Sequence, residues 1–183
     1  VVPDMITCAK GLTSGYLPLG ALIFSDRIWQ AMAAKGDRWF TSGFTYSGHP
    51  VSCAAALKSI EIIETEGLLE NAATVGDYFL ERLTSLEALP LVGQVRGRRL
   101  MVCVENVADK LTKEPLPDGV NESKRISDAA EAMGLMVRPI GHLNVMSPPL
   151  TITRGQVDFV VDVLEKAIRK VTDELVREGH RIG

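Results

Sequence analysis

The alternation of hydrophobic and polar positions predicts two strands and a helix in the first part of the chain. Residues 4–9 (DMITCA) form a short apolar run that we expect to be a buried strand, and residues 20–24 (GALIF) form a second one. Glycines and Pro18 between the two runs indicate a turn. Ser25 is a suitable N-cap for a helix that carries apolar residues on one face and ends near Gly36.

A loop and then a long helix are predicted next. Residues 37–49 are rich in Gly, Ser, Thr and aromatic side chains, which indicates irregular structure. Pro50 suits the first turn of a helix, and the alanine-rich run that follows it ends at Gly67, a natural C-cap. Because a second helical pattern resumes directly after that glycine, we expect a domain boundary there, between residues 1–66 and 67–183.

The remaining residues mix helix and strand patterns, as in a small α+β unit. Apolar runs predict a strand at Leu100–Glu105 and two more within residues 135–149, and the polar stretch 106–120 predicts a loop between strand and helix. Residues 121–133 predict a helix, and Thr153 caps a long final helix with one apolar stripe. The stripe consists of Val157, Val160, Val161, Leu164, Ile168, Val171 and Leu175.

The composition is that of an ordinary globular protein, with 46% hydrophobic and 23% charged residues. A formal net charge of −3 gives no electrostatic reason to expect nucleic acid or an anionic membrane as a partner. No apolar run reaches the length of a transmembrane helix. Cys8, Cys53 and Cys103 lack a CxxC spacing, so we expect no disulfide framework and no metal site, and a reducing compartment such as the cytoplasm.

Lys10 is the first candidate for chemistry, because it stands where an apolar strand meets a glycine-rich turn. Burial of an amine favours its neutral form, which can attack a carbonyl carbon, and nearby glycines let a flat ligand approach the backbone. A lysine that simply faces solvent explains the same residue, since most loop lysines are exposed. The local sequence leaves both interpretations open.

The segment GFTYSGHP, residues 43–50, is the second candidate. Its hydroxyls and backbone amides precede a helix, and the N-terminus of a helix suits a phosphate. Alternatively, Thr45 or Ser47 only caps the helix. His49 is either a general base or, as we favour, a structural histidine that bonds to the turn.

Arg138 and a short cluster of arginines complete the set of candidates. Pro139 keeps Arg138 in extended backbone, where its guanidinium can bind a carboxylate or can form a structural ion pair. Arg96, Arg98 and Arg99 form a short basic cluster, which we interpret as a solvated or ion-paired strand edge. The cluster is too small to indicate nucleic-acid binding.

In combination, these segments resemble a known family. PDMITCAKGLTSGYLPLGALIFS and GFTYSGHPVSCAAAL together are similar to the class III aminotransferases of the omega-amino acid type, which are pyridoxal-phosphate enzymes of fold type I. GLMVRPIGHLNVMSPPLTIT resembles the C-terminal segment of that family. The resemblance implies that residues 1–66 are the end of the large, α/β cofactor-binding domain and that residues 67–183 are the small C-terminal α+β domain.

The resemblance also implies roles for single residues. Lys10 matches the family lysine that forms a Schiff base with pyridoxal 5′-phosphate and then carries a proton between the substrate and the cofactor. Thr45, with Phe44 beside it, matches the position that binds the cofactor phosphate of the neighbouring subunit, which implies a homodimer or a higher homo-oligomer with shared active sites. Arg138 matches the mobile arginine that pairs with a substrate carboxylate.

The activity implied by this resemblance is transfer of an amino group from an ω-amino acid or amine to pyruvate or another keto acid, in a ping-pong reaction through pyridoxamine phosphate. The chain lacks an initiator Met and starts in an apolar segment, Val1-Val2. It also lacks the family's glycine-serine phosphate turn, its ring-stacking aromatic and its pyridinium-pairing aspartate. We therefore expect part of a longer protein that is inactive alone.

Two alternatives remain open at this point. One keeps the cofactor but changes the outcome of the reaction, as in an aminomutase or decarboxylase relative. The other is a non-catalytic dimerisation or partner module, which the missing cofactor contacts would explain.

Overall fold

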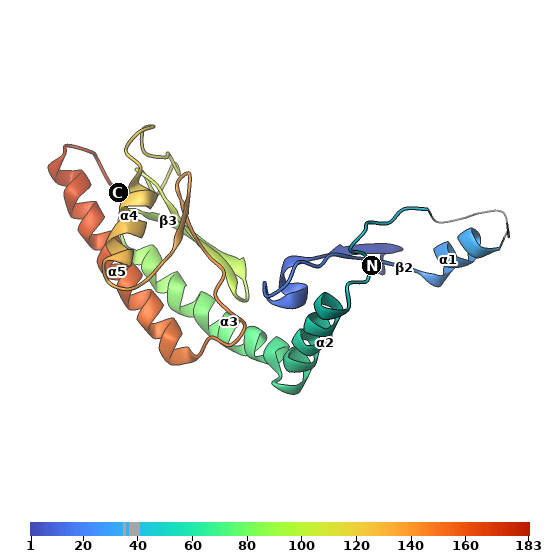
Figure 1. Cartoon of the computed structure of the whole chain (residues 1–183). Coiled ribbons are helices and arrows are strands. Elements are labelled where there is room, and N and C mark those ends of the chain that lie inside the picture. Colours follow the sequence, from blue (N-terminus) through green and yellow to red (C-terminus); the bar gives the residue numbers. More distant parts are fainter. Residues whose placement is uncertain (35, 37–40) are drawn as a thin grey trace. The chain divides into compact units, whose positions relative to one another are not determined.

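The computed structural model describes residues 1–34, 36 and 41–183, and these residues form two compact units, Val1–Gly67 (unit 1) and Leu68–Gly183 (unit 2) (Figure 1). The start of the predicted loop 37–49, residues 37–40, lies outside the described residues. Each unit has its own sheet.

The described residues of unit 1 form a two-stranded antiparallel sheet and two α-helices. Met5 pairs with Phe24 at one end of the sheet, and Cys8 pairs with Ala21 at the other. His49 is the N-cap of the second α-helix, which begins at Pro50 as the sequence predicts. The elements are β1 (Met5–Cys8), the short 3-10 helix η1 (Lys10–Thr13), β2 (Ala21–Phe24), α1 (Asp26–Ala33) and α2 (Pro50–Thr65).

The prediction that β1 is a buried strand is wrong for this chain. Met5 and Ile6 are 58% and 48% exposed. Within the described part of unit 1, β1 pairs only with β2, and Leu22 and Ile23 of that strand are also exposed. A two-stranded sheet has no second layer of its own, so its apolar side chains reach solvent unless another layer covers them.

Unit 2 is a four-stranded antiparallel sheet with helices on one face (Figure 1). The strand order is β3-β4-β6-β5, so β3 and β5 are the edge strands. The strands are β3 (Val92–Arg98), β4 (Met101–Asn106), β5 (Arg138–Ile140) and β6 (Leu143–Met146). The helices are α3 (Leu68–Thr84), the short η2 (Ser85–Ala88), α4 (Glu122–Glu131) and α5 (Arg154–Arg177).

The sequence pattern missed strand β3. Its residues include Gly93, Gly97 and two arginines, which have no strong preference for strands. Hydrogen bonding to β4 nevertheless holds it extended, with Val95 opposite Val104. The basic cluster therefore lies on a sheet edge, as predicted.

The core of unit 2 lies between the helices and the covered face of the sheet. Val102, Val104 and Met146 are buried, whereas their neighbours Cys103 and Val145, on the opposite face, are only half-buried. The predicted stripe of α5 is confirmed, since six of its seven residues are buried and Val160 packs at the margin of the core. The sheet thus has one face covered by helices and one face that is open within unit 2.

The start of α5 is fixed by a capping box, as predicted for Thr153. The Gln156 N–H donates to Thr153 Oγ1 at 3.3 Å, and the Thr153 N–H donates to Gln156 Oε1 at 2.9 Å. One turn later, Asp158 accepts hydrogen bonds from Tyr78 Oη at 2.6 Å and from Arg82 Nε at 2.9 Å. These two bonds join α5 to α3 beside the core, and they hold the pKa of the Asp158 carboxyl below its ordinary value.

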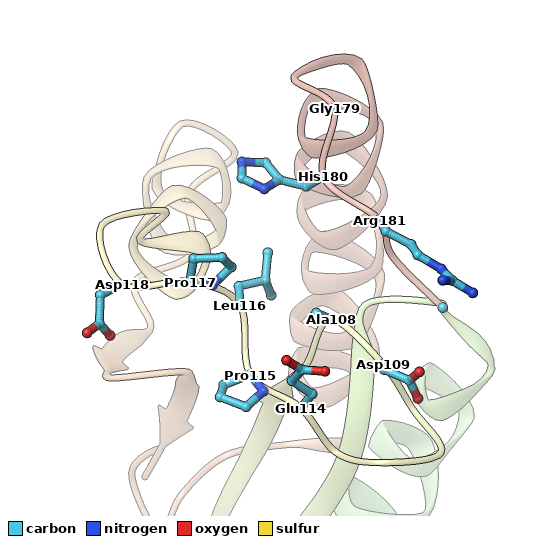
Figure 2. A pocket seen from close by; sticks show the side chains of 11 residues that line it. Ala108, Asp109, Glu114, Pro115, Leu116, Pro117, Asp118, Gly179, His180 and Arg181 are labelled. Atoms are coloured by element: carbon cyan, nitrogen blue, oxygen red, sulfur yellow. The ribbon is translucent and has the colours of Figure 1, made fainter.

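The C-terminal tail folds back onto the loop between β4 and α4. The Gly183 N–H donates to the Ala108 carbonyl at 2.9 Å. A pocket of about 620 Å³ lies between the tail and the loop, with His180 and Leu116 among its lining residues (Figure 2). Asp109 lies at its rim, and its pKa is lowered because the Thr112 and Leu111 N–H groups donate to its carboxylate.

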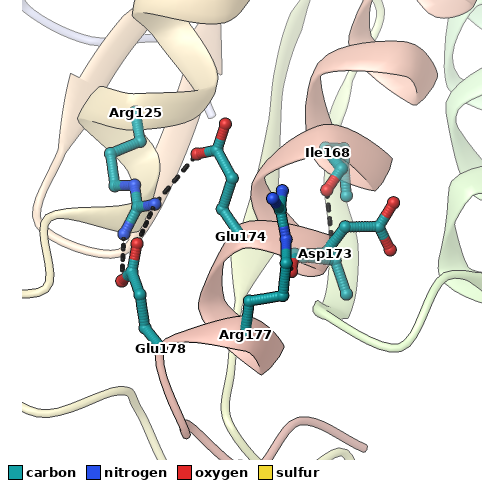
Figure 3. Close-up of polar contacts among 7 residues, drawn as sticks. Arg125, Ile168, Asp173, Glu174, Arg177 and Glu178 are labelled. Atoms are coloured by element: carbon teal, nitrogen blue, oxygen red, sulfur yellow. Dashed lines mark hydrogen bonds and ion pairs between the residues drawn. The ribbon is translucent and has the colours of Figure 1, made fainter.

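An ion-pair network joins α4 to the end of α5 (Figure 3). Arg125 donates to both carboxylate oxygens of Glu178, each at 2.8 Å, and to Glu174 at 2.9 Å. The Arg125 side chain as a whole is about three-quarters buried, so the pairing is better shielded from solvent than a fully exposed one. Arg125 lowers the pKa of Glu178, because its hydrogen bonds favour the ionised carboxylate.

This network predicts a pH-dependent part of the stability. The folded-state pKa of Glu178 lies below the ordinary value of 4.5, so the unfolded chain takes up this proton first. The stabilisation is complete above that value and is lost as the pH falls through the folded-state pKa. We expect Arg125→Gln to lower the urea midpoint at neutral pH and to approach the wild-type midpoint as the pH falls below 4.5.

The matched control is Arg169→Gln, which removes an exposed pair with Glu165 within one turn of α5. Its effect should be small at every pH, because exposed i,i+4 pairs contribute about 0.3–0.5 kcal/mol. A difference between Arg125→Gln and wild type that stays constant down to pH 3 would contradict the assignment.

Candidate functional site

Lys10 lies at the start of η1, directly after β1, in an uncommon backbone conformation. Its φ is 52°, in the left-handed region that side-chain-bearing residues rarely adopt. Such a conformation costs about 1–3 kcal/mol and persists only where the surrounding structure imposes it. Strained residues concentrate at functional sites, so the backbone at Lys10 is an independent reason to single out this lysine.

The structure fixes the segment around Lys10 through two side-chain hydrogen bonds. Thr13, which is 2% exposed, donates from Oγ1 to the Leu17 carbonyl at 2.5 Å and closes the turn. The hydroxyls of Ser14 and Ser59 are 2.9 Å apart, and this hydrogen bond ties η1 to the middle of α2. Lys10 is therefore anchored to the same helix whose N-terminus follows Thr45.

Of the two interpretations of Lys10 that the sequence leaves open, a buried amine and a lysine that faces solvent, the structure agrees with the second. The residue is exposed, as is most of β1 before it, so no apolar surface in the described part of unit 1 excludes water from the amine. The geometry thus supplies an accessible primary amine on a strained backbone, rather than a desolvated one.

Thr45 begins a turn, residues 45–48, that leads into α2. The turn is stabilised by the Phe44 N–H, which donates to Ser47 Oγ at 2.9 Å. No hydrogen bond among the described residues uses the hydroxyl or the N–H of Thr45. Phe44 and Tyr46, on either side of it, are 85% and 80% exposed. The turn therefore presents its polar groups at the N-terminal end of a long helix.

His49 has a structural role, as we favoured, and neither Thr45 nor Ser47 caps α2. The Nδ1 atom of His49 accepts a long hydrogen bond, 3.5 Å, from the Ser52 N–H, which makes His49 the N-cap. The competing interpretation of Thr45 or Ser47 as the cap is wrong, because both residues belong to the turn 45–48. His49 stands between that turn and the first helical residue, Pro50.

Arg138 lies in unit 2, as the first residue of the edge strand β5, and is exposed. The strand register places Arg138 opposite Val145 of β6. Val145 lies opposite Cys103 of β4, and Cys103 lies opposite Arg96 of β3. Directly opposite residues share a face, so Arg138 lies on the open face of the sheet. None of the ion pairs among the described residues includes Arg138.

The predicted basic cluster differs from Arg138, because two of its arginines form ion pairs. Arg96 pairs with Glu105 at 2.5 Å, and Arg99 pairs with Asp77 and donates to the Ala73 carbonyl at 2.8 Å. Two of the three clustered arginines are thus held by structural partners, which agrees with the predicted ion-paired edge. The structural-ion-pair interpretation of Arg138 finds no partner among the described residues.

A buried polar cluster that we did not predict from the sequence lies beneath the β5–β6 hairpin. Glu122, Asn106 and Asn144 are at most 1% exposed, yet each is charged or an amide. The only signal was the position of Asn144, since it shares the inward face of its strand with Met146.

The predicted site residues are thus divided between the two units. Lys10 and Thr45 lie in unit 1 and are linked through α2, and Arg138 lies in unit 2. None of them lines the pocket of Figure 2, whose walls come from the tail and from the loop after β4. That pocket is therefore not the candidate site.

Comparison with known proteins identifies the family. The family model Aminotransferase class-III matches residues 1–168. A diaminobutyrate–2-oxoglutarate transaminase from Halomonas elongata is 42% identical, and the match covers 98% of this chain and 39% of that protein. The structure of an (S)-enantioselective omega-transaminase from Thermomicrobium roseum is 46% identical, with a TM-score of 0.88 over 93% of this chain and 38% of that one.

A third match is the PLP-bound structure of an amine transaminase from an uncultivated Pseudomonas species. It is 44% identical, with a TM-score of 0.88, and the match covers 93% of this chain and 39% of that one. The chain therefore belongs to the class III aminotransferases, a pyridoxal-phosphate-dependent family of fold type I, which confirms the predicted family and fold class. It spans about 40% of the length of the curated relatives it matches.

Among the described residues, no helix combines the length and the apolar character needed to cross a membrane.

Proposed function

We propose that this chain is part of a pyridoxal-phosphate-dependent enzyme that transfers an amino group from an ω-amino acid or amine to pyruvate or another keto acid, in two half-reactions. Residues 1–66 belong to the large cofactor-binding domain, and residues 67–183 form the small C-terminal domain. The observation that carries the proposal is Lys10, an accessible amine on strained backbone in a chain of this family. The ω-amino donor class is supported by the omega-transaminase and amine transaminase among the related structures.

The donor groups of unit 1 suit this cofactor. Lys10 offers a primary amine, the group that condenses with an aldehyde. Thr45 offers a hydroxyl and an N–H without partners among the described residues, at the N-terminal end of α2, where a phosphate is favoured. The adjoining N–H of Phe44 already donates to Ser47 Oγ. We therefore propose that Phe44 contributes to the shape of the phosphate site and does not donate its N–H to the phosphate.

The chain's own residues have distinct tasks in the reaction. Pyridoxal phosphate, when bound, supplies the aldehyde and a conjugated ring that withdraws electrons from the substrate. Lys10 Nζ holds the cofactor and, once the substrate amine has displaced it, takes the proton from the substrate Cα. Thr45 binds the phosphate of the neighbouring subunit, so the active unit is a homodimer or a larger homo-oligomer. Arg138 binds the substrate carboxylate, for which its unpaired guanidinium is suited.

We also propose that the enzyme acts in the cytoplasm, because the spacing of Cys8, Cys53 and Cys103 in the sequence does not indicate a disulfide framework. The relatives are about two and a half times as long as this chain, so we propose that these residues act within a longer polypeptide.

Covalent trapping tests the role of Lys10. Borohydride reduction of the full-length holoenzyme should fix the cofactor on the peptide that contains Lys10, as read by mass spectrometry. Lys10→Ala should lose this label and about 10³-fold or more of the transamination rate, because one group serves as both anchor and proton carrier. The control is Lys58→Ala, an exposed lysine of α2 that pairs with Glu61. A label that persists on another peptide of Lys10→Ala would refute the assignment.

Subunit mixing tests whether Thr45 acts across an interface. Lys10→Ala and Thr45→Ala homo-oligomers should each be impaired, the second through weaker cofactor binding by about tenfold or more. Mixed dimers should regain activity, because one of their two sites combines an intact Lys10 with an intact Thr45 from the other subunit. Absence of recovery after verified subunit exchange would show that both residues serve the same subunit.

Donor selectivity tests the role of Arg138. The half-reaction is followed with donor alone, so that the carboxylate of the keto acid plays no part. Arg138→Ala should raise the apparent Kd of β-alanine about 10- to 100-fold, the loss expected for a charge-assisted contact, and should leave propylamine within about twofold. Equal changes for both donors would contradict a carboxylate contact. Arg98→Ala, on the opposite edge strand, is the matched control.

A further inference from the structure

The turn between β5 and β6 is fixed in an unusually complete way. Ile140 and Leu143 pair across the hairpin, so Gly141 and His142 form a two-residue turn. Gly141 has a φ of 56°, which the first position of a type II′ turn requires. Arg138 lies three residues before this glycine, in the same short strand.

Helix α4 holds the turn through the side chains of its first two residues. Ser123 Oγ donates to the Gly141 carbonyl at 2.5 Å, and Glu122 Oε1 lies 2.7 Å from His142 Nδ1. Glu122 and Ser123 are 1% and 3% exposed. A carboxylate that is removed from water to this extent is costly unless it is hydrogen-bonded, so the contact with His142 is needed for its burial.

Asn106, at the end of β4, and Asn144 of β6 also hold this turn. The N–H and the Nδ2 of Asn106 both donate to the His142 carbonyl, each at 2.9 Å. Asn144 Nδ2 donates to the Ser123 carbonyl at 2.8 Å, and its Oδ1 accepts from Asn106 Nδ2 at 2.9 Å. The turn, the start of α4 and the end of β4 thus form one hydrogen-bonded cluster in the covered side of the sheet.

Strand β5 is three residues long, and all three residues are exposed. Within the part of the chain that the structure describes, it forms a ladder only with β6, and α4 lies beside it. The Gly141–His142 turn joins β5 to β6, so the contacts that α4 makes with this turn also help to set the position of Arg138 on the sheet.

From this geometry we propose that Ser123 and Glu122 are positioning residues for Arg138. By clamping the Gly141–His142 turn, they set the point from which the Arg138 guanidinium reaches a carboxylate-bearing donor. The inference rests on the proposed role of Arg138 and extends it to residues on another element. Small displacements of a binding group weaken a directional contact strongly, so loosening the turn should weaken carboxylate binding selectively.

The test uses the full-length holoenzyme and the half-reaction with β-alanine or propylamine, which differ by the carboxylate. Ser123→Ala should raise the apparent Kd of β-alanine about 3- to 10-fold, the equivalent of one net hydrogen bond, and should leave the propylamine Kd and both limiting rates within about twofold. The matched control is Ser85→Ala, which loses a serine-to-carbonyl bond to Arg82 elsewhere in unit 2 and should change neither donor.

A double-mutant cycle separates positioning from general stability. If Ser123 acts through Arg138, then Ser123→Ala should have no further effect on β-alanine when Arg138→Ala is already present. Additive effects in the double variant, or equal effects of Ser123→Ala on both donors, would overturn the inference and leave the role of Arg138 intact. A single Arg138→Ala variant with unchanged selectivity would instead refute the proposed role of Arg138.

A second pair of variants covers the case in which Ser123→Ala does not fold. Glu122→Gln keeps an oxygen next to His142, whereas Glu122→Ala removes it. We expect the β-alanine Kd to rise less in Glu122→Gln than in Glu122→Ala, with propylamine unchanged in both. A β-alanine Kd that is identical in these two variants and the wild type would overturn the inference.

Discussion

The packing of the apolar stripe of α5 against α3 and α4, in the core that these helices share with the covered face of the four-stranded sheet, is the interaction on which unit 2 depends. Val157, Leu164 and Ile168 are completely buried there, together with Phe79 and Leu83 of α3. Because side chains alternate along a strand, committing one face of the sheet to this core leaves every second residue on the other face. Arg138 is accessible for that reason, and so are Arg96 and Arg98 at the far edge.

Unit 1, in contrast, has many apolar residues that its own described residues do not cover. Helix α2 is rich in apolar residues on all sides, but within the described residues only Ser52, Ala56 and Ser59 of this helix are buried. A helix that is hydrophobic all round is normally enclosed by other elements. Together with the open faces of β1 and β2, this agrees with a chain that spans about 40% of the length of its relatives. The two units therefore differ in how far their own residues complete a core.

Periodic segments could be predicted from the sequence because local pattern and tertiary role coincide in them. The α2 and α5 helices began where Pro50 and Thr153 predicted, and the stripe of α5 faces the core. Strand β3 could not be found in this way, since its glycines and arginines acquire a strand conformation only by pairing with β4. The burial expected for β1 failed because periodicity reports that a strand is apolar and not what covers it.

The candidate site shows the same limit. Lys10 and Thr45 stood out through their neighbours in the chain, whereas the left-handed backbone of Lys10 was visible only in the structure. Glu122 and Asn144 look like surface residues in the sequence, and their burial results from contacts between segments about twenty residues apart. Roles that depend on such contacts cannot be predicted from local pattern alone.

The proline in the middle of β5 has a consequence beyond the hairpin. An edge strand normally offers a row of free amide and carbonyl groups to which an extended peptide can add, and this is a route to aggregation. Pro139 interrupts that row, and the cationic side chain before it discourages a close neighbour. The rim of the sheet can therefore stay exposed without recruiting another polypeptide, which protects the protein from edge-to-edge association.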